Sequence, residues 1–185
     1  MRERWLNVPN VITLARLAAV PAVGWLIHTH EWAAASAVFL VAALSDGLDG
    51  FLARSLGQTT KIGAALDPVA DKALGIVTLV MLSLEGEIPW WVTLAILTRD
   101  TVIVLGALSY RRLAGQLEIR PTRLGKAHTF AEFALLLLVL GALAGWLQPG
   151  GWIMALFVGV TAIALASGAQ YVWIWWAKAR RERVF

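Results

Sequence analysis

The 185-residue sequence contains no cysteine, and only 15% of its residues are charged. Without cysteine the chain has neither a disulfide framework nor thiolate chemistry. The scarcity of charge, combined with a hydrophobic content of 59%, excludes an ordinary soluble domain of this size. The net charge of +4 is modest, and in so apolar a chain it favours contact with anionic lipid headgroups over nucleic acid. The composition therefore predicts an integral membrane protein, with a single domain over residues 1–185.

Six apolar segments follow a short N-terminal segment, residues 1–8, which we expect to form an interfacial helix. Each segment has about the 20 residues that a bilayer requires. Breaks with charged residues, glycine and proline separate them. The sequence thus predicts an all-α membrane protein with six transmembrane helices, at residues 11–29, 33–54, 62–83, 90–112, 127–147 and 152–177.

Lysine and arginine are distributed unevenly between the two sides that six spans would create. Thirteen lie at the termini and in the loops of one side, and none lies in the loops of the other. Because positively charged loops stay in the cytoplasm, we expect both termini and the active site to face the cytoplasm from the inner membrane. The tryptophans near the span ends fit interfacial belts.

Four aspartates interrupt the apolar sequence between residues 46 and 71. Helical spacing places two groups of residues on one face each of two successive helices. The first group is Asp46, Asp49, Gly50, Ala53 and Arg54, and the second is Gly63, Asp67 and Asp71. A polar turn between the two helices would make them antiparallel and bring the acidic faces together. Converging carboxylates repel one another, so we expect one or two divalent cations between them. Oxygen ligands without histidine or cysteine favour magnesium or manganese over zinc.

These residues complete the pattern D-x-x-D-G-x-x-A-R, eight residues, G-x-x-x-D-x-x-x-D, which resembles the signature of the CDP-alcohol phosphatidyltransferases. The resemblance implies a homodimeric membrane enzyme that transfers the phosphatidyl group of CDP-diacylglycerol to an alcohol and releases CMP. It also implies roles for the acids. Asp46, Asp49 and Asp67 would be metal ligands, and Asp71 would be the general base with a metal contact of its own.

The small residues of the signature leave space for the nucleotide. Gly50, Ala53 and Gly63 lack bulk where a nucleotide must approach the backbone closely, although tight helix packing uses the same residue types. Arg54 suits a phosphate or nucleotide contact at the cavity mouth, with a positive-inside anchor as the alternative. We assign these four residues, with Asp49, to the CDP-binding site.

The first predicted helix carries three polar residues spaced by three, Asn10, Thr13 and Arg16, which share one helix face. The start of this helix resembles the N-terminal helix of the family, so we expect all three residues to face the nucleotide diphosphate. Helix capping by Asn10 and snorkelling of Arg16 to the membrane surface are the alternatives.

A second cationic group is predicted to bind the phosphate of the acceptor. Arg123 and Lys126 lie where a cytoplasmic loop enters the fifth segment, and an anionic acceptor needs such a pair beside an acidic metal site. Arg99 either joins them or forms an internal salt bridge with Asp100. Lys72, next to Asp71, is expected to balance the acid cluster.

Histidines give two further patterns. His28, His30 and Glu31 are spaced like metal ligands, but they lie on the opposite membrane side from the aspartates, so we interpret them as an interfacial loop. His128 is interpreted as a boundary residue between a loop and the fifth helix.

The acceptor alcohol follows from shorter resemblances. The NVPN start, DGLDGFLAR and DPVADK resemble phosphatidylglycerophosphate synthases, whose acceptor is glycerol 3-phosphate. Three other elements resemble CMP-forming cardiolipin synthases, whose acceptor is phosphatidylglycerol: Thr98-Arg99-Asp100, Tyr110 and Pro121-Thr122. We expect phosphatidylglycerol as the acceptor, with glycerol 3-phosphate as the alternative.

A small cation or proton transporter could use the same buried acids as a relay. The acids, however, cluster at one level near one face, with no second polar set continuing across the membrane and no inverted repeat. The sequence therefore favours the enzyme.

Overall fold

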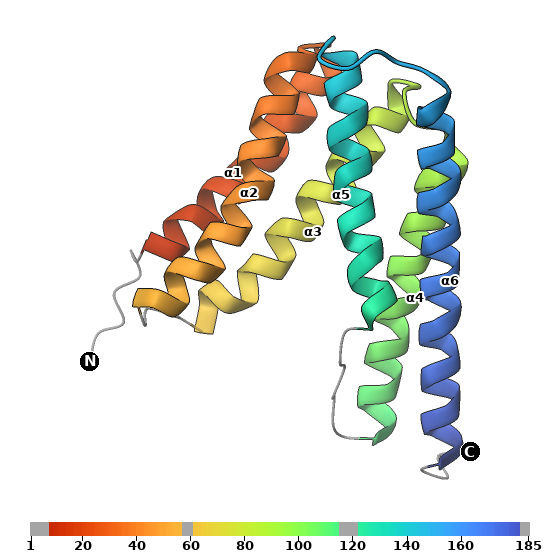
Figure 1. Ribbon diagram of the computed structural model, residues 1–185. Helices are drawn as coiled ribbons and strands as arrows, with labels where there is room; N and C mark the ends of the chain where they lie inside the picture. Colours follow the sequence, from red (N-terminus) through yellow and green to blue (C-terminus); the bar gives the residue numbers. More distant parts are fainter. Residues whose placement is uncertain (1–7, 57–60, 115–121, 182–185) are drawn as a thin grey trace. The chain divides into compact units, whose positions relative to one another are not determined.

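The computed structural model describes residues 8–56, 61–114 and 122–181 of the chain. Within these ranges every regular element is an α-helix and no strand is present (Figure 1). The all-α class is therefore confirmed for this part of the chain. The helices are α1 Val8–His28, α2 Trp32–Leu56, α3 Lys61–Leu84, α4 Trp90–Ala114, α5 Arg123–Leu143 and α6 Gly151–Arg181.

Helix α5 begins and ends four residues earlier than the predicted segment 127–147. It begins at Arg123 because Thr122 caps it, with Thr122 Oγ1 accepting a hydrogen bond from Gly125 N at 3.0 Å. It ends near Gly145, whose φ of 77° only glycine adopts freely. There Trp146 N donates to Gly141 O at 2.9 Å, which completes a Schellman motif. Hydropathy alone does not detect these local caps.

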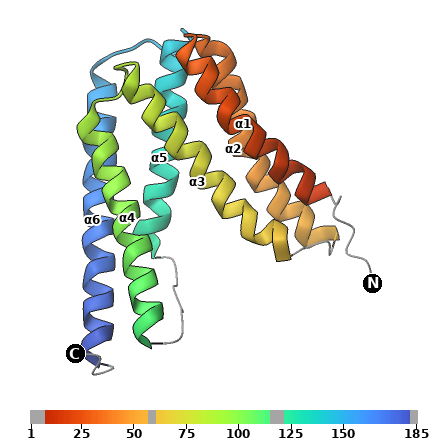
Figure 2. The ribbon, with the colours of Figure 1, turned by 180° about the vertical axis from the view of Figure 1, so that it is seen from behind.

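The chain divides into two compact units, Met1–Ile88 with Leu136–Pro149 and Pro89–Leu135 with Gly150–Phe185, and each is described by itself. In the first unit α1 packs against α2 and α3, and α2 also contacts α3. The three helices lie side by side in both views (Figures 1 and 2). Fully buried apolar side chains hold them together, among them Ile27, Phe39 and Leu74.

Successive helices of this unit run in opposite directions, because only three and four residues separate them in the chain. The start of α1, the end of α2 and the start of α3 consequently lie at the same end of the unit (Figure 1). The sequence pattern puts all four signature aspartates in the halves of α2 and α3 nearest this end.

In the second unit α4 and α6 pack along each other in the same direction. The two helices lie close together at Gly106 of α4, where an added Cβ would overlap the Trp175 ring of α6. Glycine at this position allows the tryptophan to lie directly on the α4 backbone.

Replacing Gly106 by alanine is expected to lower the free energy of unfolding by about 1–3 kcal/mol, the usual cost of overpacking. Gly159 of α6 is the matched control, because an added Cβ there meets nothing within 4 Å. Gly159→Ala should be neutral or stabilising by up to about 1 kcal/mol, through helix propensity. Thermal unfolding of both variants in detergent measures the difference, and a Gly106→Ala variant as stable as Gly159→Ala would contradict this packing.

Among the residues whose side chains the structure describes, three helical stretches are long and apolar enough to cross a membrane: Trp90–Ser109, Arg123–Leu143 and Gly151–Lys178. Shorter apolar stretches occur at Ile12–His28 and Trp32–Ser45. The last three predicted spans thus coincide with candidates by length and composition, and such helices indicate a membrane protein.

Candidate active site

The four signature aspartates lie on the two helices that the sequence predicts, two on α2 and two on α3. The structure describes the helical backbone at Asp46, Asp49 and Asp67, whereas their side chains lie outside the described part. The same holds for the CDP-site residues Asn10, Gly50, Ala53, Arg54 and Gly63.

The aspartates match in pairs by their height along the two helices. Asp49 precedes the end of α2 by seven residues and Asp67 follows the start of α3 by six, so each lies about 10 Å from its helix end at about 1.5 Å per residue. Asp46 and Asp71 each lie ten residues, or about 15 Å, from the same ends. Since α2 and α3 are antiparallel neighbours, each acid of α2 has a counterpart at its own level on α3.

Arg16 of α1 reaches the fourth aspartate. Its Nη1 lies 3.4 Å from Asp71 Oδ1, and the Arg16 side chain is 0% exposed whereas that of Asp71 is 31% exposed. So complete a burial contradicts snorkelling to the membrane surface, which makes that alternative wrong. Thr13, one turn earlier, is also buried, so this polar face of α1 points into the unit. Asp71 keeps enough exposure to meet a second reactant.

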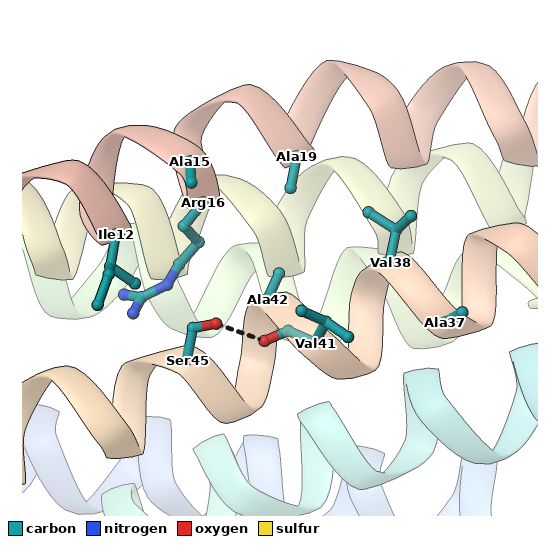
Figure 3. Close-up of a pocket in the computed structure, with 9 residues that line it drawn as sticks. All are labelled: Ile12, Ala15, Arg16, Ala19, Ala37, Val38, Val41, Ala42 and Ser45. Carbon is teal, nitrogen blue, oxygen red and sulfur yellow. Dashed lines mark hydrogen bonds between the residues drawn. The ribbon is translucent and has the colours of Figure 1, made fainter.

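A cavity of about 290 Å³ lies between α1 and α2, beside the Arg16–Asp71 pair. Seven of its nine lining side chains are apolar, and the other two are Arg16 and Ser45. Figure 3 shows the Arg16 guanidinium and Ser45 together at one end, where Ser45 Oγ donates to Val41 O at 2.7 Å. Ser45 directly precedes Asp46, so the polar end of the cavity lies where the acid-bearing stretches begin.

The donors available here are carboxylate oxygens, which fit a hard divalent cation such as Mg²⁺ or Mn²⁺. Among the side chains that the structure describes, no group of three acids or histidines could hold a metal. Three of the four predicted ligands are outside that set. The donor chemistry and the matched heights of the four acids are therefore the observations that fit the predicted metal.

Arg99 of α4 lies buried among polar partners in the second unit. Its Nη1 donates to Asp100 Oδ1 at 2.8 Å, and its Nε and Nη2 lie 3.4 and 3.1 Å from Ser167 Oγ of α6. The guanidinium carbon is 5.9 Å from the centre of the Tyr171 ring. Of the two interpretations of Arg99, the internal ion pair is the one that the structure contains.

Tyr171 connects this cluster to the first turn of α5. Its hydroxyl accepts a hydrogen bond from Thr122 N at 3.2 Å. A Cβ at Gly125 would lie 3.1 Å from the Tyr171 oxygen and 3.4 Å from Arg99 Nη2. Glycine therefore lets the start of α5 approach Arg99 closely.

Arg123 and Lys126 lie on this same turn of α5, one on each side of Gly125, and both are exposed. The structure thus brings the three predicted acceptor-binding cations into one region of the second unit. Arg99 is neutralised there by Asp100, so Arg123 and Lys126 carry the exposed positive charge.

Sequence reasoning missed Ser167 and Tyr171, which hold Arg99 and the start of α5 in place. Both are uncharged and lie within a long apolar helix, so neither stands out in the sequence as a buried charged residue does. A signal was nevertheless present: the two polar residues are spaced by four and share one helix face within apolar sequence.

The histidines at the α1–α2 turn meet an acid of the α3–α4 turn. His28 Nδ1 lies 3.1 Å from Glu85 Oε1, and His30 Nε2 lies 3.6 Å from Glu85 Oε2. Both imidazoles are exposed, which agrees with a loop position. Their link to Glu85 joins the two turns and was not predicted.

His128 is not a boundary residue as predicted. It lies in the second turn of α5, fully buried, with Nδ1 3.7 Å from Glu132 Oε2. The prediction is wrong because the Thr122 cap starts the helix earlier than hydropathy suggests.

The chain is similar in sequence to known proteins over most of its length. The family model described as CDP-alcohol phosphatidyltransferase matches residues 6–177. A "Probable phosphatidylglycerophosphate synthase" of Mycobacterium tuberculosis is 36% identical over 189 residues, which cover 98% of this chain and 85% of the relative. A "CDP-diacylglycerol--glycerol-3-phosphate 3-phosphatidyltransferase" of Escherichia coli K12 is 34% identical over 172 residues, covering 90% of this chain and 93% of the relative.

A "Putative cardiolipin synthase" of Mycobacterium bovis is 36% identical over 132 residues, 70% of this chain. The match spans 62% of that relative's length, which is less than two thirds. The names of these relatives thus include both of the enzyme groups that the sequence resembles. The family match covers all six predicted segments, together with the complete aspartate signature. The chain therefore belongs to the CDP-alcohol phosphatidyltransferase family.

Proposed function

We propose that this chain transfers the phosphatidyl group of CDP-diacylglycerol to a glycerol-type hydroxyl and releases CMP. The observation that carries the proposal is the contact between buried Arg16 and Asp71. It joins α1 to α3, one of the two acid-bearing helices, and holds one oxygen of a carboxylate that is partly accessible. An oriented, accessible carboxylate is what a general base requires.

In the proposed reaction Asp71 accepts the proton of the acceptor hydroxyl. The hydroxyl oxygen forms a bond to the diacylglycerol-linked phosphorus, and the bond from that phosphorus to the CMP oxygen breaks. CMP leaves with the bonding electron pair. Divalent ions held by Asp46, Asp49, Asp67 and Asp71 would neutralise the negative charge that develops on the leaving group.

We assign the nucleotide to α1, α2 and α3. The support is that Thr13 is buried on the same α1 face as Arg16, and that the signature helices start and end at the same end of the first unit. The residues assigned to CDP are Asn10, Thr13, Asp49, Gly50, Ala53, Arg54 and Gly63.

We assign the phosphate of the acceptor to Arg99, Arg123 and Lys126. The support is the packing of the first turn of α5 against Arg99 through Gly125. The two exposed cations attract an anion, while the buried Arg99 keeps a planar guanidinium fixed by Ser167 and Asp100.

The proposed membrane topology has six spans with both termini in the cytoplasm. Helices α1, α2 and α3 have 21, 25 and 24 residues, so each is long enough for a hydrocarbon core of about 30 Å. The homodimer that the resemblance implies is part of this proposal.

Two acceptors have a specific observation in their favour. Phosphatidylglycerol is supported by the Thr98-Arg99-Asp100 element and by the relative named as a cardiolipin synthase. Glycerol 3-phosphate is supported by relatives that match 98% and 90% of this chain.

To identify the acceptor, the purified chain in detergent is supplied with CDP-diacylglycerol, Mg²⁺ and either phosphatidylglycerol or glycerol 3-phosphate. Phosphatidylglycerol is expected to give cardiolipin and CMP in equal amounts, measured by lipid chromatography and nucleotide analysis. Turnover with glycerol 3-phosphate alone would contradict this expectation and establish the second acceptor.

A further inference from the structure

The cavity between α1 and α2 differs chemically at its two ends. Arg16 and Ser45 line one end, and Ala19, Ala37 and Val38 line the other, as Figure 3 shows. Because many of the lining side chains are small alanines, space remains between α1 and α2 here. A ligand that matches this cavity carries negative charge at one end and an apolar body behind it.

The polar end of the cavity is continuous with the proposed reaction centre. Arg16 both lines the cavity and contacts Asp71 at 3.4 Å. Ser45 lines it and immediately precedes Asp46 on α2. A phosphate at the aspartates would therefore leave its attached lipid at the mouth of the cavity, next to a cation of opposite charge.

The size and the opening of the cavity fit a single alkyl chain. Its α2 wall runs from Ala37 to Ser45, which are eight positions or about 12 Å apart, against about 15 Å for one leaflet of a 30 Å hydrocarbon core. Val41 on the rim is 65% exposed, so the cavity is open along its side. A volume of about 290 Å³ is too small for a whole diacylglycerol or for a helix of another protein.

We propose that this groove holds one acyl chain of the CDP-diacylglycerol substrate and sets the acyl-chain preference of the enzyme. The inference rests on the proposed function. In a bilayer, lipid and side chains are equally apolar, so selectivity comes from close packing. A chain tethered by its phosphate at the aspartates is positioned to fill the gap between α1 and α2, and Ala19, Ala37 and Val38 limit how far it extends.

The test is to fill the apolar end of the groove and to compare substrates of different chain length. In Ala19→Phe, the ring would occupy the space between Ala19 and Val38. The matched control is Ala18→Phe on the same helix, because Ala18 is exposed and does not line the groove. CMP release is measured with CDP-dioleoylglycerol and with CDP-dihexanoylglycerol, each over a range of concentrations.

Ala19→Phe is expected to raise KM for the dioleoyl substrate by about tenfold or more relative to the dihexanoyl one, the usual effect of misfit in an apolar pocket. Ala18→Phe should leave the ratio of the dioleoyl KM to the dihexanoyl KM unchanged. A merely structural effect would change KM for both substrates by the same factor.

A second pair of variants keeps the test decisive if Ala19→Phe does not fold. Ala37→Phe fills the same end from α2, and Ala34→Phe, an exposed position outside the groove, is its control. An unchanged dioleoyl-to-dihexanoyl ratio in the folded groove variants would overturn the proposal while leaving the function intact. Absence of CMP release by the wild type with either substrate would instead overturn the proposed function, and the groove assignment with it.

Discussion

Replacing Asp67 by asparagine is expected to lower the rate of CMP release by about a thousandfold or more, at the upper end of the effect of removing one preorganised electrostatic group. The amide has nearly the shape of the carboxylate but lacks its charge, so a divalent ion would lose a ligand and the transition state would lose its counter-charge. Asp46→Asn should have the same effect, because Asp46 belongs to the same set of acids on the neighbouring helix. Because each substitution removes a negative charge but keeps the shape of the side chain, the variants should fold.

The measurement is CMP release by the purified variants, together with helicity by circular dichroism and size by gel filtration. Glu31→Gln is the matched control, since Glu31 is an exposed acid at the α1–α2 turn and belongs to no part of the proposed site. It should retain wild-type activity. Wild-type turnover in either aspartate variant would show that the metal-binding assignment is wrong.

Replacing Arg99 by methionine is expected to lower the free energy of unfolding by about 3–5 kcal/mol. The variant leaves the buried Asp100 carboxylate without the guanidinium that lies 2.8 Å away. It also removes the bonds to Ser167 that connect α4 to α6. Thermal or denaturant unfolding in detergent measures the loss, and an unchanged stability would contradict the ion pair.

The double variant Arg99→Met, Asp100→Leu separates a structural role from a role in acceptor binding. Apolar replacement of a buried ion pair is often neutral, so stability should largely return. If Arg99 also holds the acceptor phosphate, KM for the acceptor should stay raised by about tenfold or more, as for a lost charged partner. Recovery of both stability and KM would confine Arg99 to the ion pair.

Much of the fold could be predicted because hydropathy and helical spacing are local properties. Five predicted segments coincide closely with α1–α4 and α6, whereas α5 is shifted by its caps at Thr122 and Gly145. The same shift explains why His128 was placed at the boundary of the helix instead of in its second turn. A single hydroxyl and a single glycine set these ends, and neither changes the average hydropathy of the segment.

The site could be predicted only where residues are close in sequence. Spacing by three put Thr13 and Arg16 on one face of α1, but Asp71 is 55 positions from Arg16, and no local pattern predicts that contact. Arg99 showed two plausible roles in sequence, and the carboxylate of the next residue decided which contact forms. Ser167 and Tyr171 were missed because their function depends on packing between α6 and distant helices.

The central claim is that this chain releases CMP from CDP-diacylglycerol by transferring the phosphatidyl group to an alcohol, with its four aspartates as the reaction centre. The most direct test follows CMP release by the purified wild type in detergent, with Mg²⁺ and a glycerol-type acceptor. Release is expected to match the new phospholipid one to one, to stop when the ion is chelated, and to return when Mg²⁺ or Mn²⁺ is restored. Absence of CMP release with any alcohol, or release that continues unchanged after chelation, would contradict the account.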